Sequence, residues 1–163
     1  MSDKRFPRHV AIILDGNGRW AQQRGRERTY GHQVGAANVK NIVRAAGHMG
    51  IRCLTIYAFS TENWKRPEQE VSLLMALIKE YLQKNVRYMH EHNVRIRFIG
   101  HIQGLSEELQ QIIQDSESLT KNNTGLTLQL AINYGGRDEI VRTVKGIAQS
   151  VLEGNLTVQD ITE

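Results

Sequence analysis

The stretch that most constrains the fold is the first apolar run together with the polar turn that follows it. Residues 10–14 are five apolar residues in succession, three of them β-branched. Such a run is typical of a strand buried on both faces of a parallel sheet. Asp15 comes next, and Gly16 and Gly18 then free the backbone to turn with exposed N–H groups beside the Arg19 guanidinium. A carboxylate, free amides and a guanidinium at the carboxyl end of a strand favour a metal-bound phosphate or diphosphate.

Strands and helices alternate along the rest of the chain. Apolar runs predict further strands, and helical periodicity predicts helices between them. The strands are expected at 53–59, 94–99 and 126–132, and the helices at 33–49, 68–89, from 106 onward, and at 138–152. This alternation predicts one α/β domain over residues 1–163, with a mostly parallel central sheet and helices on both faces.

Three of the predicted strands end in polar, turn-forming clusters, at 15–19, 60–66 and 133–137. Because ligands of parallel sheets bind beyond the carboxyl ends of the strands, these clusters are expected to converge on one site. The second cluster offers hydroxyls from Ser60 and Thr61, an amide from Asn63 and a phosphate fork from Arg66, with the apolar ring of Trp64 beside them. Together the clusters favour a ligand that is anionic at one end and apolar at the other.

The predicted helix 68–89 has an apolar band wider than the roughly 100° stripe needed to pack on one sheet face. Leu73, Leu77 and Tyr81 widen the band. The helix is therefore expected to meet something apolar on two sides. Two explanations remain open here: a second helix or subunit, and the wall of a lipid-binding cavity.

Other interpretations of the first motif fit less well. Gly16-x-Gly18 after a strand resembles a dinucleotide fingerprint, but no Asp or Glu stands between Arg28 and Thr61 to bind a ribose. Asp15 could be the nucleophile of a phosphotransferase, although the second carboxylate that such sites generally carry is replaced by Asn17. A P-loop is excluded because no Gly-Lys-Ser/Thr follows the glycines.

Composition narrows the class of protein further. The chain has 163 residues, a net charge of +4 and a single cysteine. A single cysteine forms no internal disulfide, so we expect a reducing, cytoplasmic setting. An apolar substrate would still bring the protein to the inner face of a membrane. A modest positive charge suits an anionic substrate, and we expect no nucleic-acid partner. No run approaches the ~20 apolar residues of a membrane span.

Four segments resemble the cis-prenyltransferases, and in particular the bacterial undecaprenyl diphosphate synthases. They are residues 9–21, Gly31-His32, residues 57–67 and residues 133–137. The resemblance implies an enzyme that condenses isopentenyl diphosphate onto farnesyl diphosphate with cis stereochemistry, giving a long polyprenyl diphosphate for the cell-wall lipid carrier. It also implies Mg²⁺ as cofactor and a homodimer.

The resemblance assigns roles to residues of this chain. Asp15 would hold Mg²⁺, and Asn63 would assist proton removal. The substrate-binding positions would be Gly16, Asn17, Gly18, Arg19, Trp20, Arg28, His32, Ser60, Thr61, Glu62, Trp64 and Arg66. The product tunnel would be lined by Ala58, Leu73, Leu77 and Leu126.

Residues 157–160 form a capping-box pattern that predicts a helix start close to the last residue. We therefore expect the chain to be the front portion of a longer protein, with its sheet incomplete at the C-terminal end. The family carries further isopentenyl diphosphate ligands and a metal-binding glutamate beyond this point. The 163 residues alone are accordingly expected to bind farnesyl diphosphate weakly and to perform no condensation.

Two other functions remain open. One is a non-catalytic, prenyltransferase-like subunit that supports an active partner. The other is a phosphate-ester hydrolase built around Asp15.

Overall fold

The structure, a computed structural model, describes residues 6–162. Four strands and five α-helices alternate along the chain, with short 3₁₀ turns between some of them. The strands are β1 (His9–Ile13), β2 (Cys53–Ser60), β3 (Arg95–Ile99) and β4 (Thr127–Tyr134). The helices are α1 (Asn17–Gln22), α2 (Arg28–His48), α3 (Glu68–Glu91), α4 (Glu107–Thr120) and α5 (Gly136–Leu152). The 3₁₀ turns are η1 (Thr61–Lys65), η2 (Ile102–Gly104) and η3 (Val158–Asp160).

The four strands form one sheet in the order β1-β2-β4-β3, and every neighbouring pair is parallel. The carboxyl ends of all four strands therefore lie at the same edge of the sheet. β1, β2 and β4, the strands that lead into the three polar clusters, are adjacent in this order, so the predicted convergence has a structural basis. The α/β class and the parallel sheet predicted from the sequence are confirmed.

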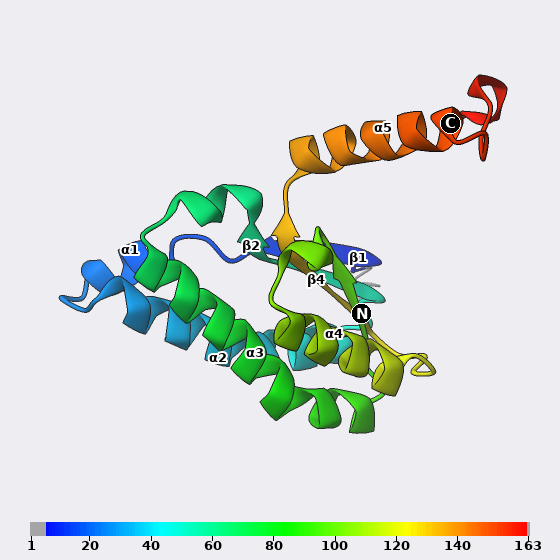
Figure 1. The fold of residues 1–163 in the computed structure, drawn as a ribbon. Helices are drawn as coiled ribbons and strands as arrows, with labels where there is room; N and C mark the ends of the chain where they lie inside the picture. Colours follow the sequence, from blue (N-terminus) through cyan, green and yellow to red (C-terminus); the bar gives the residue numbers. More distant parts are fainter. Residues whose placement is uncertain (1–5, 163) are drawn as a thin grey trace.

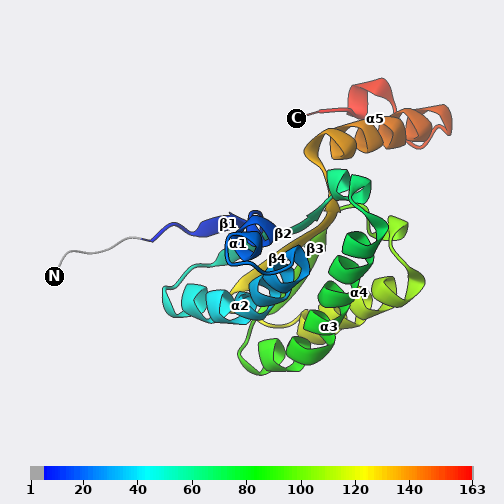
Figure 2. The ribbon, with the colours of Figure 1, turned by 90° about the vertical axis from the view of Figure 1, so that its left-hand side faces the viewer.

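Helices α2, α3 and α4 lie together on one side of the sheet (Figures 1 and 2). The core between them and the sheet is made of aliphatic and aromatic side chains from the strands and from the inner faces of the helices. Leu54, Ile56 and Phe59 of β2 are almost fully buried there, as are Leu82 and Met89 of α3.

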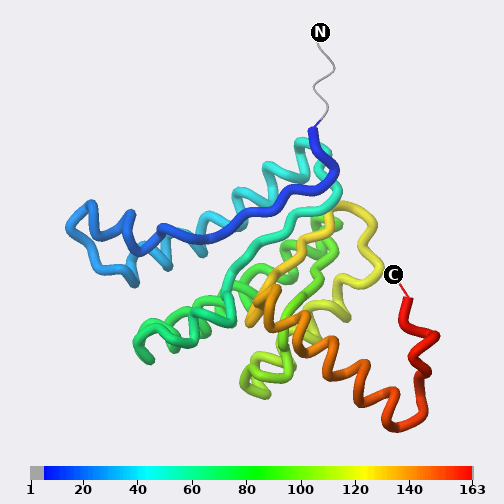
Figure 3. The backbone as a smooth tube through the Cα atoms, turned by 90° about the horizontal axis from the view of Figure 1, so that it is seen from above, coloured from blue at the N-terminus to red at the C-terminus, as the bar shows by residue number. Residues whose placement is uncertain are grey.

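The opposite face of the sheet is polar. His9 Nε2 lies 2.7 Å from Thr55 Oγ1, and Thr55 Oγ1 donates to Gln129 Oε1 at 3.4 Å. Among residues 6–162 no helix packs on this face: α5 leaves the end of β4 on that side, but none of its residues is buried. The expectation of helices covering both faces is thus met on one face only in the described part of the chain. Figure 3 shows α5 extending away from the side that carries β1.

Two segments differ from the sequence-based expectation. Residues 17–22 form the short helix α1, and α2 begins at Arg28, several residues before the expected start at 33. The polar residues at the start of α2 concealed it, because its first turns pack against α1 instead of against the sheet. Gly31 makes that contact possible: a Cβ there would lie 2.0 Å from the Asn17 carbonyl oxygen.

The C-terminal capping box is present: Thr157 N–H and Oγ1 both donate to Asp160 Oδ2. In the part of the chain that the structure describes, no helix is both long and apolar enough to cross a membrane.

Candidate active site

The turn after β1 places a carboxylate and a guanidinium at the sheet edge. Gly16 adopts a positive φ of 86°, which reverses the chain before α1 begins at Asn17. Asp15 Oδ1 accepts from the Gly16 N–H at 2.7 Å, and Asp15 Oδ2 accepts from Arg19 Nη2 at 3.1 Å. Both side chains are about two-thirds exposed, at 67% and 70%. The pair is therefore open to a ligand that arrives from solvent.

A second carboxylate, Glu70 of α3, gathers three basic side chains. Its Oε1 accepts from Arg28 Nη2 at 3.2 Å, from His32 Nε2 at 3.1 Å and from Arg66 Nη1 at 3.0 Å. Arg28 Nε also donates to Oε2 at 3.3 Å. Hydrogen bonds from Arg28, and then from His32, hold the pKa of Glu70 below its ordinary value, while burial opposes them. Glu70 is therefore ionised at neutral pH and fixes the three groups in one place.

These groups and the β1 turn enclose a small polar pocket of about 80 Å³. It is lined by Leu14, Asp15, Gly16, Asn17, Gly18, Arg19, Arg28, His32 and Arg66. Gly18 leaves room for the Arg28 guanidinium, since a Cβ there would lie 2.9 Å from Arg28 Cζ and the guanidinium would have to shift. Eight of the predicted site residues, from three separate segments, thus share one pocket.

The cluster after β2 folds as a capped 3₁₀ turn. Asn63 Oδ1 accepts from the Ser60 N–H at 3.1 Å, and the Ser60 hydroxyl accepts from the backbone N–H of Asn63, which completes a capping box. The exposed Glu62 carboxyl has a lowered pKa because it accepts hydrogen bonds from the Glu62 backbone N–H and, second, from the Ser60 hydroxyl. The Asn63 side-chain oxygen accepts a hydrogen bond within the turn, so its NH₂ group is the part left to contact a ligand. An amide is a poor base, so this group is suited to positioning a ligand and not to removing a proton.

Trp64 is fixed by the third cluster. Its Nε1 donates to Asn133 Oδ1 at 2.7 Å, and Asn133 Nδ2 donates to the His101 carbonyl at 2.9 Å. Asn133 is buried and holds a left-handed φ of 51°. Thr61 approaches the same segment closely, because a Cβ on Gly135 would lie 2.2 Å from Thr61 Oγ1. Asn133 and Gly135 of the third cluster therefore hold Trp64 and Thr61 of the second cluster in place.

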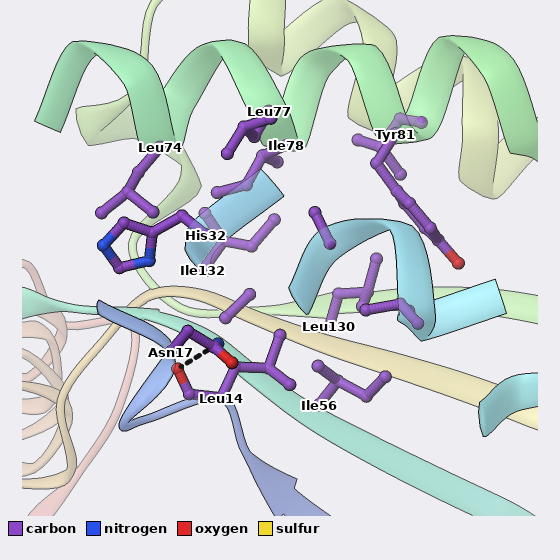
Figure 4. Close-up of a pocket in the computed structure, with 14 residues that line it drawn as sticks. Leu14, Asn17, His32, Ile56, Leu74, Leu77, Ile78, Tyr81, Leu130 and Ile132 are labelled. Carbon is purple, nitrogen blue, oxygen red and sulfur yellow. Dashed lines mark hydrogen bonds between the residues drawn. The ribbon is translucent and has the colours of Figure 1, made fainter. Parts of the chain in front are cut away.

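An apolar pocket of about 80 Å³ adjoins the polar one and shares Leu14, Asn17 and His32 with it. Figure 4 shows Leu74, Leu77 and Ile78 of α3 facing Leu14 and Asn17 across the cavity. His32 lies at one end of the pocket and Tyr81 at the other. The wide apolar band of α3 is explained on both counts left open by the sequence: α3 packs between α2 and α4, and it also lines this pocket.

The predicted tunnel residues are distributed unevenly. Ala58 and Leu77 line the apolar pocket. Leu73 lies on α3 outside this lining, and Leu126, which precedes β4, is buried in the core at the far end of the sheet. Trp20 is also outside the polar pocket: it lies on the surface, where it stacks on Tyr30 with ring centroids 6.3 Å apart.

Glu70 was not predicted from the sequence. It lies four residues after Arg66, a spacing at which oppositely charged side chains can pair, and this spacing was the available signal. Nothing in the sequence indicated that the same carboxylate would also reach Arg28 and His32, about forty residues earlier, since those contacts depend on how α2 and α3 pack.

The donor set of the polar pocket suits a magnesium ion that arrives with phosphate. Within residues 6–162 no group of three or more His, Cys, Asp or Glu side chains could hold a metal on its own. Mg²⁺, however, often takes one carboxylate from the protein and completes its shell with water and substrate phosphates. The three arginines exceed the two carboxylates by only one positive charge, so a diphosphate would need a further cation there. Asp15 is the exposed ligand that could hold it.

Comparison with known proteins places the chain. Residues 13–163 match the family described as "Putative undecaprenyl diphosphate synthase". The chain belongs to this family. It is 51% identical over 157 residues to an isoprenyl transferase of Agrobacterium fabrum, an alignment that covers 96% of this chain and 64% of the relative. It is 52% identical over 156 residues to the Escherichia coli ditrans,polycis-undecaprenyl-diphosphate synthase described as farnesyl-diphosphate specific, covering 96% of this chain and 62% of that one.

Two solved structures share the fold. Lavandulyl diphosphate synthase from Lavandula x intermedia, in complex with dimethylallyl diphosphate, superposes with a TM-score of 0.89 at 39% identity over 96% of this chain and 67% of that one. A probable undecaprenyl diphosphate synthase from Campylobacter jejuni superposes with a TM-score of 0.71 at 31% identity, over 88% and 62% of the two chains. The chain thus spans less than two thirds of the length of the two curated relatives above.

Proposed function

We propose that this chain carries the allylic-substrate site of a cis-prenyltransferase that adds isopentenyl diphosphate to farnesyl diphosphate. The observation that supports this most directly is that the two pockets adjoin. A polar cavity with three arginines, a histidine and an exposed carboxylate shares Leu14, Asn17 and His32 with the neighbouring apolar cavity. A ligand that fills both is anionic at one end and hydrocarbon at the other.

Each residue has a defined role in the proposed reaction. Arg19, Arg28 and Arg66 bind the diphosphate of the allylic substrate, and His32 donates to it at the junction of the two pockets. As the allylic carbon–oxygen bond breaks, negative charge accumulates on the leaving diphosphate, and these preorganised donors stabilise it more strongly than the ground state. The alkene of isopentenyl diphosphate then attacks the allylic carbon, and a proton is lost to restore a double bond.

Mg²⁺ held by Asp15 would supply further positive charge to the leaving group. Asp15 positions its free lone pairs by accepting from Gly16 N–H and Arg19. Asn63 and Ser60 belong to the capped turn that follows β2, where the Asn63 amide would orient a phosphate or a water molecule. Ala58, Leu73, Leu77 and Leu126 remain the proposed tunnel positions, of which Ala58 and Leu77 line the pocket next to the phosphate site. A homodimer, as the resemblance implies, is part of the same proposal.

The test combines binding with turnover. Titration calorimetry with farnesyl diphosphate, with and without Mg²⁺, should give binding that strengthens with the metal in the wild type and loses this metal dependence in Asp15→Ala. In the intact protein, Asp15→Ala should reduce turnover far more than it weakens farnesyl diphosphate binding, because the metal acts chiefly on the transition state. Asp115→Ala, which removes an exposed carboxylate of α4 outside both pockets, is the matched control.

Incubation of the intact protein with farnesyl and isopentenyl diphosphates separates the other functions. Release of inorganic phosphate from farnesyl diphosphate without a longer prenyl product would identify a phosphate-ester hydrolase instead. Binding without any turnover by the intact protein would indicate a supporting subunit. Near-normal turnover of Asp15→Ala would refute Asp15 as the metal ligand.

A further inference from the structure

Tyr81 closes the apolar pocket at the end remote from the phosphate site. In Figure 4 its side chain extends from α3 across the cavity, and its hydroxyl points away from the His32 end. The ring lies in the apolar lining together with Leu77 and Ala36. Any hydrocarbon chain that enters from the polar pocket and continues past Leu77 therefore meets this ring.

The Tyr81 hydroxyl is buried and has no hydrogen-bond partner within residues 6–162. Burial raises the pKa of this phenol, so the group stays protonated. A buried hydroxyl without a partner is unfavourable, because it loses water and gains nothing in return. The present position of the ring therefore leaves the hydroxyl without water or another partner, which is unfavourable. A position that returned the hydroxyl to polar surroundings would remove this cost.

Such surroundings exist on the other side of the ring. A groove of about 370 Å³ runs between α2 and α3 and shares Ala36, Leu77 and Tyr81 with the apolar pocket. Its other walls carry polar side chains from both helices, among them Gln33, Glu80, Lys84 and Asn85. Tyr81 is thus the partition between a small apolar pocket and a larger half-polar groove.

The sizes of the two spaces favour an opening. A cavity of about 150 Å³ is enough for one benzene molecule, which has six carbons. The apolar pocket, at about 80 Å³, is smaller than this. A fifteen-carbon farnesyl chain cannot be accommodated behind the polar pocket unless the cavity expands, and the groove beyond Tyr81 is the adjoining space.

We propose that Tyr81 is a gate: when a prenyl chain outgrows the inner pocket, the ring swings into the groove between α2 and α3 and the distal end of the chain follows. This rests on the proposed function, since it takes the ligand to be a prenyl diphosphate. In the open position the Tyr81 hydroxyl reaches water and the polar side chains of the groove. The hydroxyl therefore favours opening, while the bulk of the ring opposes it. Tyr81 is accordingly a residue that determines which chain lengths the site accepts.

The experiment measures binding as a function of chain length. Dimethylallyl, farnesyl and geranylgeranyl diphosphates are titrated with Mg²⁺ into the wild type, Tyr81→Phe, Tyr81→Ala and the control Tyr88→Phe. Tyr88 is on the same helix two turns further on, but its ring packs against Lys40 and His92, away from both cavities. The readout is the ratio of the dissociation constants of geranylgeranyl and dimethylallyl diphosphate, because the five-carbon chain does not reach Tyr81. A general loss of stability would change both constants and leave the ratio unaltered.

Tyr81→Phe removes the penalty on the closed position, so the ratio should rise by roughly tenfold. Tyr81→Ala removes the obstruction, so the ratio should fall several-fold. Tyr88→Phe should leave it at the wild-type value. If Tyr81→Ala does not fold, as judged by circular dichroism, the Phe variant decides alone.

A wild-type ratio in Tyr81→Phe would overturn the gate. If dimethylallyl diphosphate still binds in that case, the proposed function stands without the gate. If none of the three diphosphates binds to the wild type, both proposals fail together.

Discussion

Removing the Glu70 carboxylate should destabilise the protein through the residues that it holds. Glu70 is 12% exposed, and of its three partners His32 is the most deeply placed, with 8% of its side chain exposed. In Glu70→Ala the buried His32 Nε2 loses its acceptor, which costs about 1–3 kcal/mol. Arg66, at 28% exposure, and Arg28, at 40%, can turn toward water, so each loses only about 0–1 kcal/mol. The expected total is about 1–5 kcal/mol, centred on about 3 kcal/mol.

Glu70→Gln should cost less. The amide oxygen can still accept one hydrogen bond, but its NH₂ group faces donors, so about half of the effect remains, or about 1–2 kcal/mol. Urea unfolding followed by circular dichroism measures both variants. With a slope of about 1–3 kcal/mol per molar urea, Glu70→Ala should lower the midpoint by about 1–2 M. The control is Glu80→Ala, which removes an exposed carboxylate paired with Lys84 on the same helix and should shift the midpoint very little.

The pH dependence gives a second measurement. The partners of Glu70 lower its pKa in the folded state below the ordinary value of 4.5. A carboxyl group of this kind stabilises the fold fully above its unfolded pKa, and the contribution is lost as the pH falls through the folded pKa. The stability difference between wild type and Glu70→Gln should therefore be constant at neutral pH and shrink at pH values below 4.5. A Glu70→Ala midpoint equal to that of the wild type would refute the reasoning, because the cluster would then contribute nothing to the fold.

Three further substitutions test the site and its supports. Ala58→Leu fills the apolar pocket next to the phosphate site and should shorten the prenyl products of the intact protein; product lengths measured by chromatography would contradict this if they stayed unchanged with activity retained. Gly31→Ala brings a Cβ within 2.0 Å of the Asn17 carbonyl, so α1 must shift from α2 at a cost of about 1–3 kcal/mol in urea unfolding, whereas Gly47→Ala, which meets no atom within 4 Å, should not destabilise. Asn133→Ala leaves the Trp64 indole without its acceptor and removes a side chain suited to a left-handed φ, so a loss of about 2–4 kcal/mol and a change in tryptophan emission are expected.

Features formed by neighbouring residues could be predicted from the sequence, whereas features that depend on packing between elements could not. The β1 run and Asp15 are contiguous, so the strand and the position of the carboxylate at its end followed from a few residues. Residues 17–19 belong to α1, which was not predicted. The parallel sheet followed from alternation alone. The Glu70 cluster did not, because its members come from α2, the η1 turn and α3 and meet only when these pack.

Contacts between elements also account for the other differences. The early start of α2 depends on its packing against α1, to which Gly31 contributes by allowing close approach to Asn17. Asn133 looked like part of a third ligand cluster, but its side chain is used in holding Trp64 and the His101 carbonyl. The polarity of a side chain can be read from sequence, whereas the partner that satisfies it cannot.

The strand that carries the phosphate turn is an edge strand. Among residues 6–162, β1 is hydrogen-bonded to β2 alone, and its outward residue Ile13 is 72% exposed. Edge strands with little burial are among the first parts of a protein to open in native-state hydrogen exchange. Asp15 is attached to the end of this strand, while Glu70 and Tyr81 are on α3. A ligand that spans the two pockets therefore connects a weakly held segment to the body of the fold, and slower amide exchange in β1 would report its arrival.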